Sequence, residues 1–301
     1  ISVLSLLLGT AITVILSGNI VRPVNALSTA MQRVANGDYD VKLETKSNFE
    51  IIRRVYSDFN HMVDELNAVE TLRNDFVSNV SHEFKTPLSS VEGYAMLLQD
   101  ESLSAEARSE YTERIVVSTR RLSTLVSNIL MITKIENQTM PFTLSSYRVD
   151  EQVRQSILLL ENKWSEKNIG FEMDMDSIEF CAVEGLLGNV WSNLIDNAIK
   201  FSPEGEIIYI SLKEKDDMLS FKIANRGEPM SGETLKRIFE KFYQGDTSHK
   251  REGNGLGLAL VKKIVRVHGG SVSAVNTEDG LIEFTVNLPA KYSCERCCGS
   301  N

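Results

Sequence analysis

The chain has 301 residues, of which 42% are hydrophobic and 24% are charged, and this is enough sequence for two or three modest domains with buried cores. Its formal net charge at pH 7 is −9, and no block of lysine and arginine interrupts the acidic balance. Binding to nucleic-acid phosphates requires such a block, so we expect no nucleic-acid partner.

Residues 1–21 carry no charged side chain. As a helix they would extend roughly 30 Å, enough to cross a bilayer. We therefore predict a transmembrane helix here, and the alternative is the apolar core of a signal peptide. Arg22, Arg33 and Lys42 follow the apolar run, which favours a protein in the cell membrane with its catalytic part in the cytoplasm. The first residue is not methionine, so we expect that an upstream part, with the segment that senses a stimulus, is missing.

Residues 22–68 are typical of two short helices joined by a polar connector. Pro23 is suited to the first turn of a helix, and Gly37 ends the first apolar repeat. The second repeat has the spacing of a helix with one apolar seam. This order, directly after an apolar span, resembles the HAMP relay module.

A longer helical pattern follows over residues 69–138. Its first apolar seam consists of Phe76, Val80, Phe84, Leu88 and Val91. A polar break at residues 100–104 is followed by a second seam, formed by Ile115, Leu122, Leu125, Ile129 and Ile132. One hairpin with a single seam on each helix cannot close a core, so we predict an antiparallel helical hairpin that forms a four-helix bundle in a homodimer.

The pattern changes after about residue 142 to a mixture of short strands and helices, which predicts an α+β sandwich domain over residues 142–290. Strands are predicted at 206–212, 219–224, 271–276 and 281–288, and helices at 150–164, 185–200 and 256–268. The tail, residues 291–301, contains Cys294, Cys297 and Cys298 without a second ligand pair. We interpret it as a frayed terminus rather than a metal site.

His82 lies opposite the first apolar seam when residues are placed about 100° apart around a helix, so it should face solvent. Glu83 is adjacent to it, and Thr86 shares its face one turn later. A neutral imidazole can act as a nucleophile near pH 7, and a neighbouring carboxylate can accept the proton that is released. A lone histidine of this kind is more often an incidental surface residue.

The surrounding residues 81–88, with the sequence SHEFKTPL, resemble the phosphoacceptor box of sensor histidine kinases. The resemblance extends over nearly the whole chain. It implies that His82 is the phosphorylation site, that Glu83 is an acid/base helper, and that Thr86 orients water when phosphate is removed from the partner protein. That partner would be the receiver domain of a response regulator.

Residues 193–200, with the sequence NLIDNAIK, place Asn193, Asn197 and Lys200 on one face of a predicted helix, while Val190, Leu194 and Ala198 turn toward a core. Amide oxygens can bind Mg²⁺ and lysine can neutralise phosphate, although a solvated face would look the same. This segment resembles the N box of the family. The resemblance implies Asn197 as the Mg²⁺ ligand, Asn193 beside it, and Lys200 on the phosphates of ATP.

Closely spaced glycines open another predicted helix, at Gly253, Gly255 and Gly257, where exposed backbone N–H groups can receive an anion. They follow the sequence FEKFY at 239–243 and a polar stretch that contains Arg251. This order resembles the F box, ATP lid and G2 box of the family, and it implies that Arg251 reaches the γ-phosphate.

One motif departs from the family pattern. Residues 225–229 read NRGEP, so Asn225 stands where the family usually has aspartate, and of its two glycines only Gly227 remains. The side-chain oxygen of Asn225 can still accept a hydrogen bond from adenine. We therefore expect ATP binding that is weaker or differently tuned.

The resemblance as a whole implies a membrane-anchored sensor histidine kinase that uses Mg-ATP to phosphorylate His82 and passes the group to an aspartate. Three alternatives stay open: a phosphatase that has lost kinase activity, an ATPase machine of the same nucleotide fold, and a non-catalytic dimeric scaffold. The ATPase machine gives no role to His82, and the scaffold gives none to Asn197 and Lys200.

Overall fold

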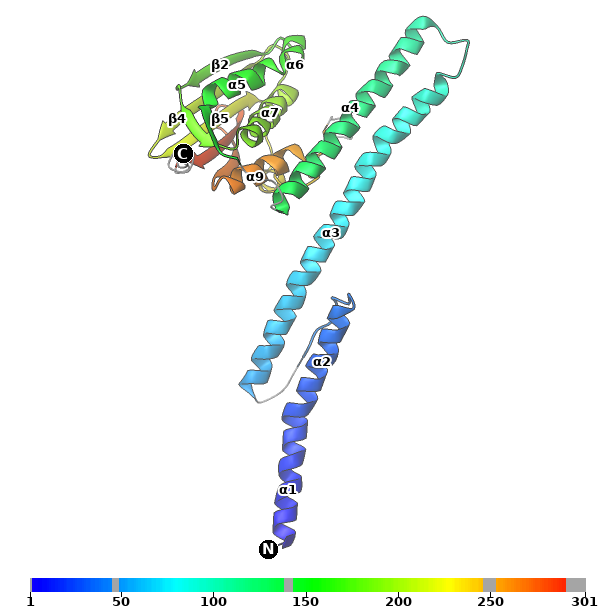
Figure 1. Ribbon diagram of the computed structural model, residues 1–301, viewed down its shortest axis with the longest axis vertical. Helices are drawn as coiled ribbons and strands as arrows, with labels where there is room; N and C mark the ends of the chain where they lie inside the picture. Colours follow the sequence, from blue (N-terminus) through cyan, green and yellow to red (C-terminus); the bar gives the residue numbers. More distant parts are fainter. Residues whose placement is uncertain (1, 45–48, 138–142, 246–252, 291–301) are drawn as a thin grey trace. The chain divides into compact units, whose positions relative to one another are not determined.

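The computed structural model describes residues 2–44, 49–137, 143–245 and 253–290 (Figure 1). Arg251 and the cysteine-containing tail, for which predictions were made above, lie outside the described residues. The chain divides into two compact units, residues 1–81 and 82–301, and each is described by itself.

The first unit begins with helical sequence. Helix α1 (Ser2–Leu16) continues through a π-helical turn (Ser17–Val21) into α2 (Arg22–Ala35), where Pro23 occupies the first turn as expected. The apolar side chains of Val3, Leu4 and Leu6 are between 71% and 75% exposed, as they would be in a helix that meets lipid. The span over residues 1–21 nevertheless stays a prediction. Within the described parts of the chain, the helix that is both long and apolar enough to cross a membrane is Ala105–Glu136, and Ser2–Ala11 is a shorter apolar stretch.

The small core of this unit joins α2, the connector and the beginning of α3 (Glu50–Leu97). Ala30, Val41, Phe59 and Val63 are buried together. Beside them, the side chain of Asn60 bonds the connector backbone twice, accepting from Leu43 N and donating to Leu43 O, each at 2.9 Å. The connector is therefore attached to α3 by apolar contact and by paired hydrogen bonds.

The predicted hairpin is present in the second unit. Helix α3 ends at Leu97. Helix α4 (Ala105–Glu136) is preceded by Ser104, whose hydroxyl caps it by accepting from Ala107 N at 3.2 Å. The two helices pair antiparallel through the rings of Tyr94 and Tyr111, whose centroids lie 5.5 Å apart.

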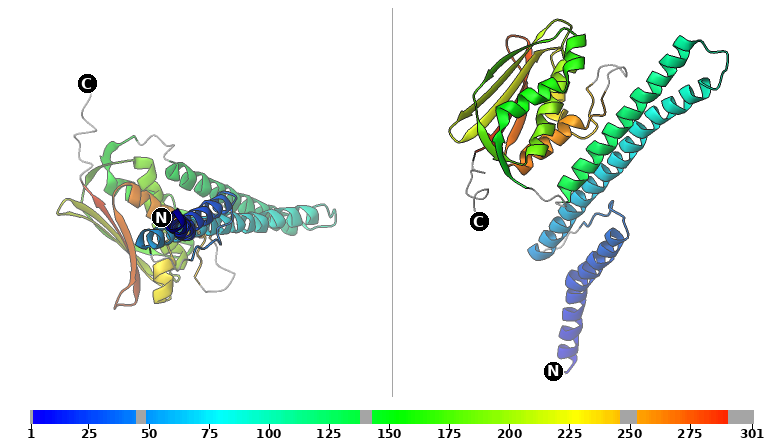
Figure 2. Two further views of the ribbon diagram at one scale, coloured as in Figure 1. Left: turned by 90° about the horizontal axis from the view of Figure 1, so that it is seen from below. Right: turned by 45° about the horizontal axis from the view of Figure 1, so that its top comes forward.

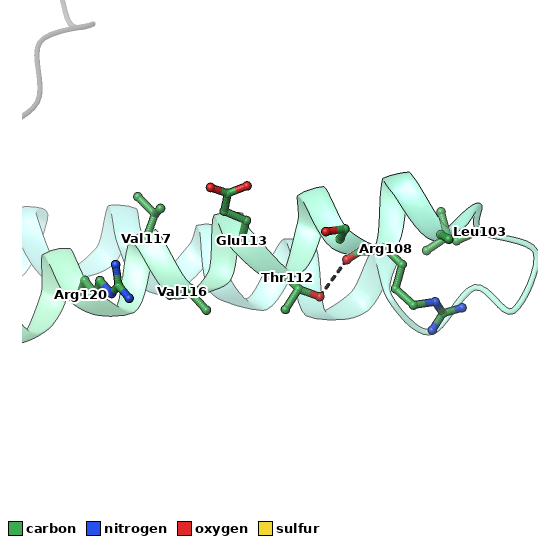
Figure 3. A pocket seen from close by; sticks show the side chains of 9 residues that line it. Leu103, Arg108, Thr112, Glu113, Val116, Val117 and Arg120 are labelled. Carbon is green, nitrogen blue, oxygen red and sulfur yellow. Dashed lines mark hydrogen bonds between the residues drawn. The ribbon is translucent and has the colours of Figure 1, made fainter. Parts of the chain in front are cut away.

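The second seam faces inward, with Leu125 and Ile132 fully buried, whereas Val117 and Leu130 of the same helix are 50% and 53% exposed. The first seam is half-buried except at Leu88, which is 58% exposed in the single chain. A shallow hollow of about 800 Å³ lies along α4 (Figure 3). It shares no residue with the predicted sites. It is lined by Leu103, Ala105, Arg108, Ser109, Thr112, Glu113, Val116, Val117 and Arg120.

The remaining residues form the predicted α+β domain, whose five-stranded sheet has the strand order β2-β4-β5-β7-β6. The strands of this sheet are β2 (Gly170–Met175), β4 (Ile207–Lys215), β5 (Met218–Arg226), β6 (Ser271–Asn276) and β7 (Leu281–Pro289). Strands β1 (Ser145–Arg148) and β3 (Glu179–Ala182) form a separate antiparallel pair. The helices are α5 (Val149–Leu158), α6 (Glu161–Glu166), α7 (Glu184–Phe201), α8 (Gly232–Arg237) and α9 (Gly257–Val267).

Helices α5, α7 and α9 cover one face of the sheet (Figures 1 and 2). The core between the helices and the sheet is dense. Trp191 on α7 is fully buried, and the centroid of its ring lies 4.7 Å from the ring centroid of Phe221 on β5. The sequence missed strands β1, β2 and β3 and helix α8, all of six residues or fewer. Strand β2 alternates apolar and acidic residues over only six positions, and it is stabilised by parallel pairing with β4 at the sheet edge, a long-range contact.

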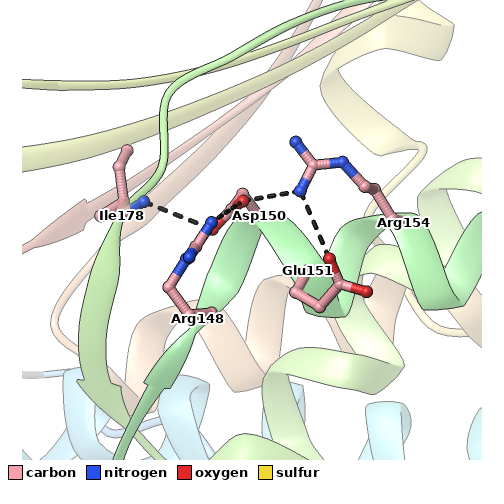
Figure 4. Close-up of polar contacts among 5 residues, drawn as sticks. All are labelled: Arg148, Asp150, Glu151, Arg154 and Ile178. Carbon is pink, nitrogen blue, oxygen red and sulfur yellow. Dashed lines mark hydrogen bonds and ion pairs between the residues drawn. The ribbon is translucent and has the colours of Figure 1, made fainter.

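The start of α5 is held by a buried carboxylate (Figure 4). The side chain of Asp150 is fully buried and accepts hydrogen bonds from Arg148, Arg154 and the backbone N–H of Ile178, at 2.7–3.3 Å. The hydrogen bond from the Arg148 guanidinium is the main cause that holds the pKa of Asp150 well below its ordinary value. This network joins α5 to the loop before β3.

Candidate functional site

His82 lies on the exposed face of α3, as its position opposite the apolar seam predicted. Thr86 is also exposed, and its hydroxyl donates to the backbone oxygen of His82 at 3.4 Å. Pro87 is buried within the helix and has no N–H to donate to the carbonyl of Glu83. The imidazole is thus open to an incoming group, with Glu83 beside it along the chain.

Glu83 is partly buried and pairs with a residue that the sequence did not single out. Its Oε2 lies 3.6 Å from Nη2 of Arg121 on α4. The side chains of Arg121 and Glu83 are 38% and 24% exposed, so solvent screens this pair only in part.

Helix α7 presents the predicted polar face. Asn193, Asn197 and Lys200 are half-exposed, whereas the residues expected in the core, Val190, Leu194 and Ala198, are at most 2% exposed. The Nδ2 of Asn193 donates to Asn189 O at 2.7 Å, one turn earlier. Its Oδ1 lies beside Gly257, at the start of α9.

The glycine-containing loop lies against this face. A Cβ added to Gly257 would come 2.6 Å from Asn193 Oδ1, and one added to Gly253 would come 2.8 Å from Lys200 Nζ. These approaches are possible because glycine has no side chain. Residues from two segments far apart in the sequence therefore meet at one edge of α7.

The loop is also attached to the segment at 239–243. The N–H of Phe242 donates to Gly255 O at 2.9 Å, and a Cβ on Gly255 would lie 2.6 Å from the backbone carbon of Phe242. Phe242 itself has a φ of 62°, a left-handed conformation that is rare for a bulky residue. The sequence placed this segment before the loop but carried no signal for its backbone conformation.

Asn225 and Gly227 lie at and just beyond the end of β5. Asn225 is 2% exposed, and its Nδ2 donates to Arg226 O at 3.0 Å, so its Oδ1 is the atom available to accept from a ligand. Gly227 lies close to Asn225, because a Cβ there would come 3.6 Å from Asn225 Nδ2. The substitution of asparagine for aspartate thus keeps an acceptor at this position.

The donor set suits Mg²⁺ held jointly with phosphates. No group of three or more His, Cys, Asp or Glu side chains in the described parts of the chain could hold a metal ion by itself. Mg²⁺ keeps several waters and takes few protein oxygens, typically together with substrate phosphates. Amide oxygens on α7, the Lys200 ammonium and the adjacent glycine backbone fit that mode of binding.

The fold and the site therefore define a nucleotide-binding domain joined to a helical hairpin on which His82 is exposed. Three family models match the chain: the HAMP domain over residues 15–68, the His Kinase A (phospho-acceptor) domain over 72–138, and the "Histidine kinase-, DNA gyrase B-, and HSP90-like ATPase" over 182–292.

The chain is also similar to a characterised relative, the heme sensor protein HssS of Staphylococcus aureus. The two are 33% identical over 288 residues, which is 95% of this chain and 62% of the relative. The chain thus spans less than two thirds of that relative's length.

Solved structures agree with this relationship. Full-length ShkA in complex with AMPPNP is 28% identical, with a TM-score of 0.54 over 71% of this chain and 45% of that one. Histidine kinase ThkA in complex with the response regulator protein TrrA has a TM-score of 0.59 over 74% of this chain and 64% of that one, and at 23% identity it supports the fold alone. The chain belongs to the sensor histidine kinases of two-component systems.

Proposed function

We propose that this chain is the signalling part of a membrane-anchored sensor histidine kinase that transfers the γ-phosphoryl group of Mg-ATP to His82 and then to an aspartate of a response regulator. The observation that carries the proposal is the meeting of the 253–257 loop with Asn193 and Lys200 on α7. A non-catalytic scaffold would gain nothing from this close approach.

Each residue of the nucleotide site has a separate role in binding Mg-ATP. Asn197 supplies an amide oxygen to Mg²⁺, with Asn193 beside it, and Lys200 neutralises phosphate oxygens. Asn225 Oδ1 accepts from the amino group of adenine. Arg251, outside the described residues, is proposed to reach the γ-phosphate. Gly253, Gly255 and Gly257 let the loop backbone approach the phosphates.

In the transfer, one ring nitrogen of His82 attacks the γ-phosphorus as the bond to the ADP oxygen breaks. The proton on the other ring nitrogen passes to Glu83. The phosphorylated imidazole is then the donor to the aspartate of the response regulator. Thr86, on the same exposed face, orients water when the kinase instead removes phosphate from that regulator.

We further propose that the chain acts as a homodimer. Apolar side chains remain exposed along both helices of the hairpin, among them Leu88 at 58% and Leu130 at 53%. A second copy would cover them in a four-helix bundle. The membrane anchor is residues 1–21, whose exposed apolar side chains suit lipid rather than water.

The test uses the 301-residue chain in detergent micelles, incubated with Mg²⁺ and γ-labelled ATP. We expect label that is lost in acid and stable in base, as for a phosphorylated histidine. His82→Gln and Asn197→Ala should abolish it. His61→Gln, a change at a second exposed histidine of α3, is the matched control and should leave labelling unchanged.

The alternatives give different results. Absence of label from a folded dimer would refute the kinase and favour a phosphatase or a scaffold. A measurement of nucleotide binding would then distinguish these two. ATP hydrolysis that continues unchanged in His82→Gln would favour an ATPase machine.

A further inference from the structure

Arg121 of α4 contacts two groups that belong to different parts of the proposed reaction. Its Nη2 lies 3.6 Å from Glu83 Oε2, and its Nε lies 3.4 Å from Oδ1 of Asn254. Glu83 is next to the phosphoacceptor, and Asn254 is inside the glycine-containing loop. One guanidinium therefore lies between the proton acceptor and the nucleotide loop.

The register of the hairpin sets this contact. Tyr94 packs on Tyr111, and the Ser118 hydroxyl lies 3.3 Å from that of Ser90. Continuing the antiparallel pairing by about three helical turns from the Tyr94–Tyr111 contact brings Arg121 opposite Glu83. Arg121 is the one cation within 4.0 Å of the Glu83 carboxylate among the described residues.

The contact between Arg121 and the glycine-containing loop also falls on a well-defined position. Asn254 lies between Gly253, which approaches Lys200, and Gly255, which bonds Phe242. Any movement of the loop as nucleotide enters must also move the Asn254 side chain. A guanidinium is suited to linking two acceptors, because its N–H groups form a planar fork with several donors.

We propose that Arg121 is a positioning residue for phosphoryl transfer: by holding Glu83 and Asn254 together, it sets the place of the Glu83 carboxylate according to the state of the nucleotide loop. This inference rests on the proposed kinase function. Arg121 itself need not touch ATP or His82. Its removal leaves the carboxylate without its partner and free to adopt several rotamers, so that fewer of them can receive the proton from His82.

The test measures the initial rate of His82 labelling against ATP concentration for the 301-residue chain and its Arg121→Gln variant. We expect the rate at saturating ATP to fall about 10-fold, while the KM for ATP changes by less than about 3-fold, because positioning affects the chemical step. Arg121→Lys should recover part of the rate, since an ammonium can pair with Glu83 but cannot bridge to Asn254 with the same fork.

A matched control removes the same charge one residue earlier. Arg120 is exposed, lines the hollow on α4 (Figure 3), and makes no ion pair with the described residues. Arg120→Gln should label at the wild-type rate. In the double variant Glu83→Gln with Arg121→Gln, the rate should be no lower than in Glu83→Gln alone, because Arg121 acts through Glu83.

Several results would overturn the inference. They are an unchanged rate in Arg121→Gln, a rise in KM with an unchanged saturating rate, an equal loss in Arg120→Gln, or losses that multiply in the double variant. Absence of label from the wild-type chain would instead refute the proposed function, and the inference with it, so the two failures are distinguishable.

Discussion

Replacing Asp150 by asparagine should destabilise the nucleotide-binding domain while leaving its shape almost unchanged. The carboxylate is fully buried and accepts from two arginines and from the Ile178 N–H (Figure 4). An amide carries no charge and presents an NH₂ group toward donors, so at least one charge-assisted hydrogen bond is lost and one donor is left unpaired.

The size of the effect follows from the exposure of the partners. Removing one member of a buried ion pair costs about 3–5 kcal/mol when the remaining charge stays buried. Arg148 and Arg154 are 53% and 40% exposed, so water can solvate them after the change. We therefore expect a loss of about 2–3 kcal/mol in the free energy of unfolding, below that range.

Tryptophan fluorescence during urea unfolding measures this loss, because the two tryptophans of the chain, Trp164 and Trp191, both lie in this domain. Asp196→Asn is the matched control. The side chains of Asp196 and Lys163, which form an ion pair, are 42% and 60% exposed, so this pair should contribute about 1 kcal/mol or less to the free energy of unfolding. A stability loss smaller than about 0.5 kcal/mol in Asp150→Asn, or equal losses in both variants, would refute the reasoning.

The same carboxylate predicts a pH dependence with a definite sign. Because the arginines hold the pKa of Asp150 below its ordinary value of 3.8, the ionised form is favoured in the folded state. The carboxylate of Asp150 makes its full contribution to the free energy of unfolding above that ordinary value. The contribution is lost as pH falls through the lower pKa of the folded state. The stability difference between wild type and Asp150→Asn should thus be constant near neutrality and shrink only below about pH 4.

Three further predictions concern the nucleotide site and the core. Gly257→Ala should weaken binding of a fluorescent ATP analogue by about 10-fold or more, since its methyl group would displace Asn193, whereas Gly185→Ala, with open space around its Cβ, should bind normally. Asn225→Ala should raise the dissociation constant for the same analogue by about 10-fold, because the acceptor for adenine is lost, and unchanged binding would show that Oδ1 has no such role. Burial lowers the pKa of His268 below its ordinary 6.5, so the neutral ring is favoured in the folded state and the melting temperature should decline as pH falls below that value, a decline that should be absent in a folded His268→Gln variant.

Local sequence determined the features that depend on a few neighbouring residues. The helical period of about 3.6 placed Val190 and Leu194 in the core and Asn193 on the polar face of α7, and the same period directed His82 to solvent. Strands β4 and β5 were predicted because their runs of β-prone residues are themselves local. These predictions hold because neighbouring side chains on one element are fixed by its backbone geometry.

Only the tertiary structure decided which of these elements meet. Gly257 approaches Asn193 across more than 60 residues of sequence, Phe242 takes a left-handed backbone conformation to receive Gly255, and Arg121 reaches both Glu83 and Asn254. Local periodicity is silent on such pairs, because each contact depends on the packing of whole helices and sheets rather than on the residues next to it. The sequence by itself therefore identified the candidate chemical groups other than Arg121, and the packing of the domain brought them together.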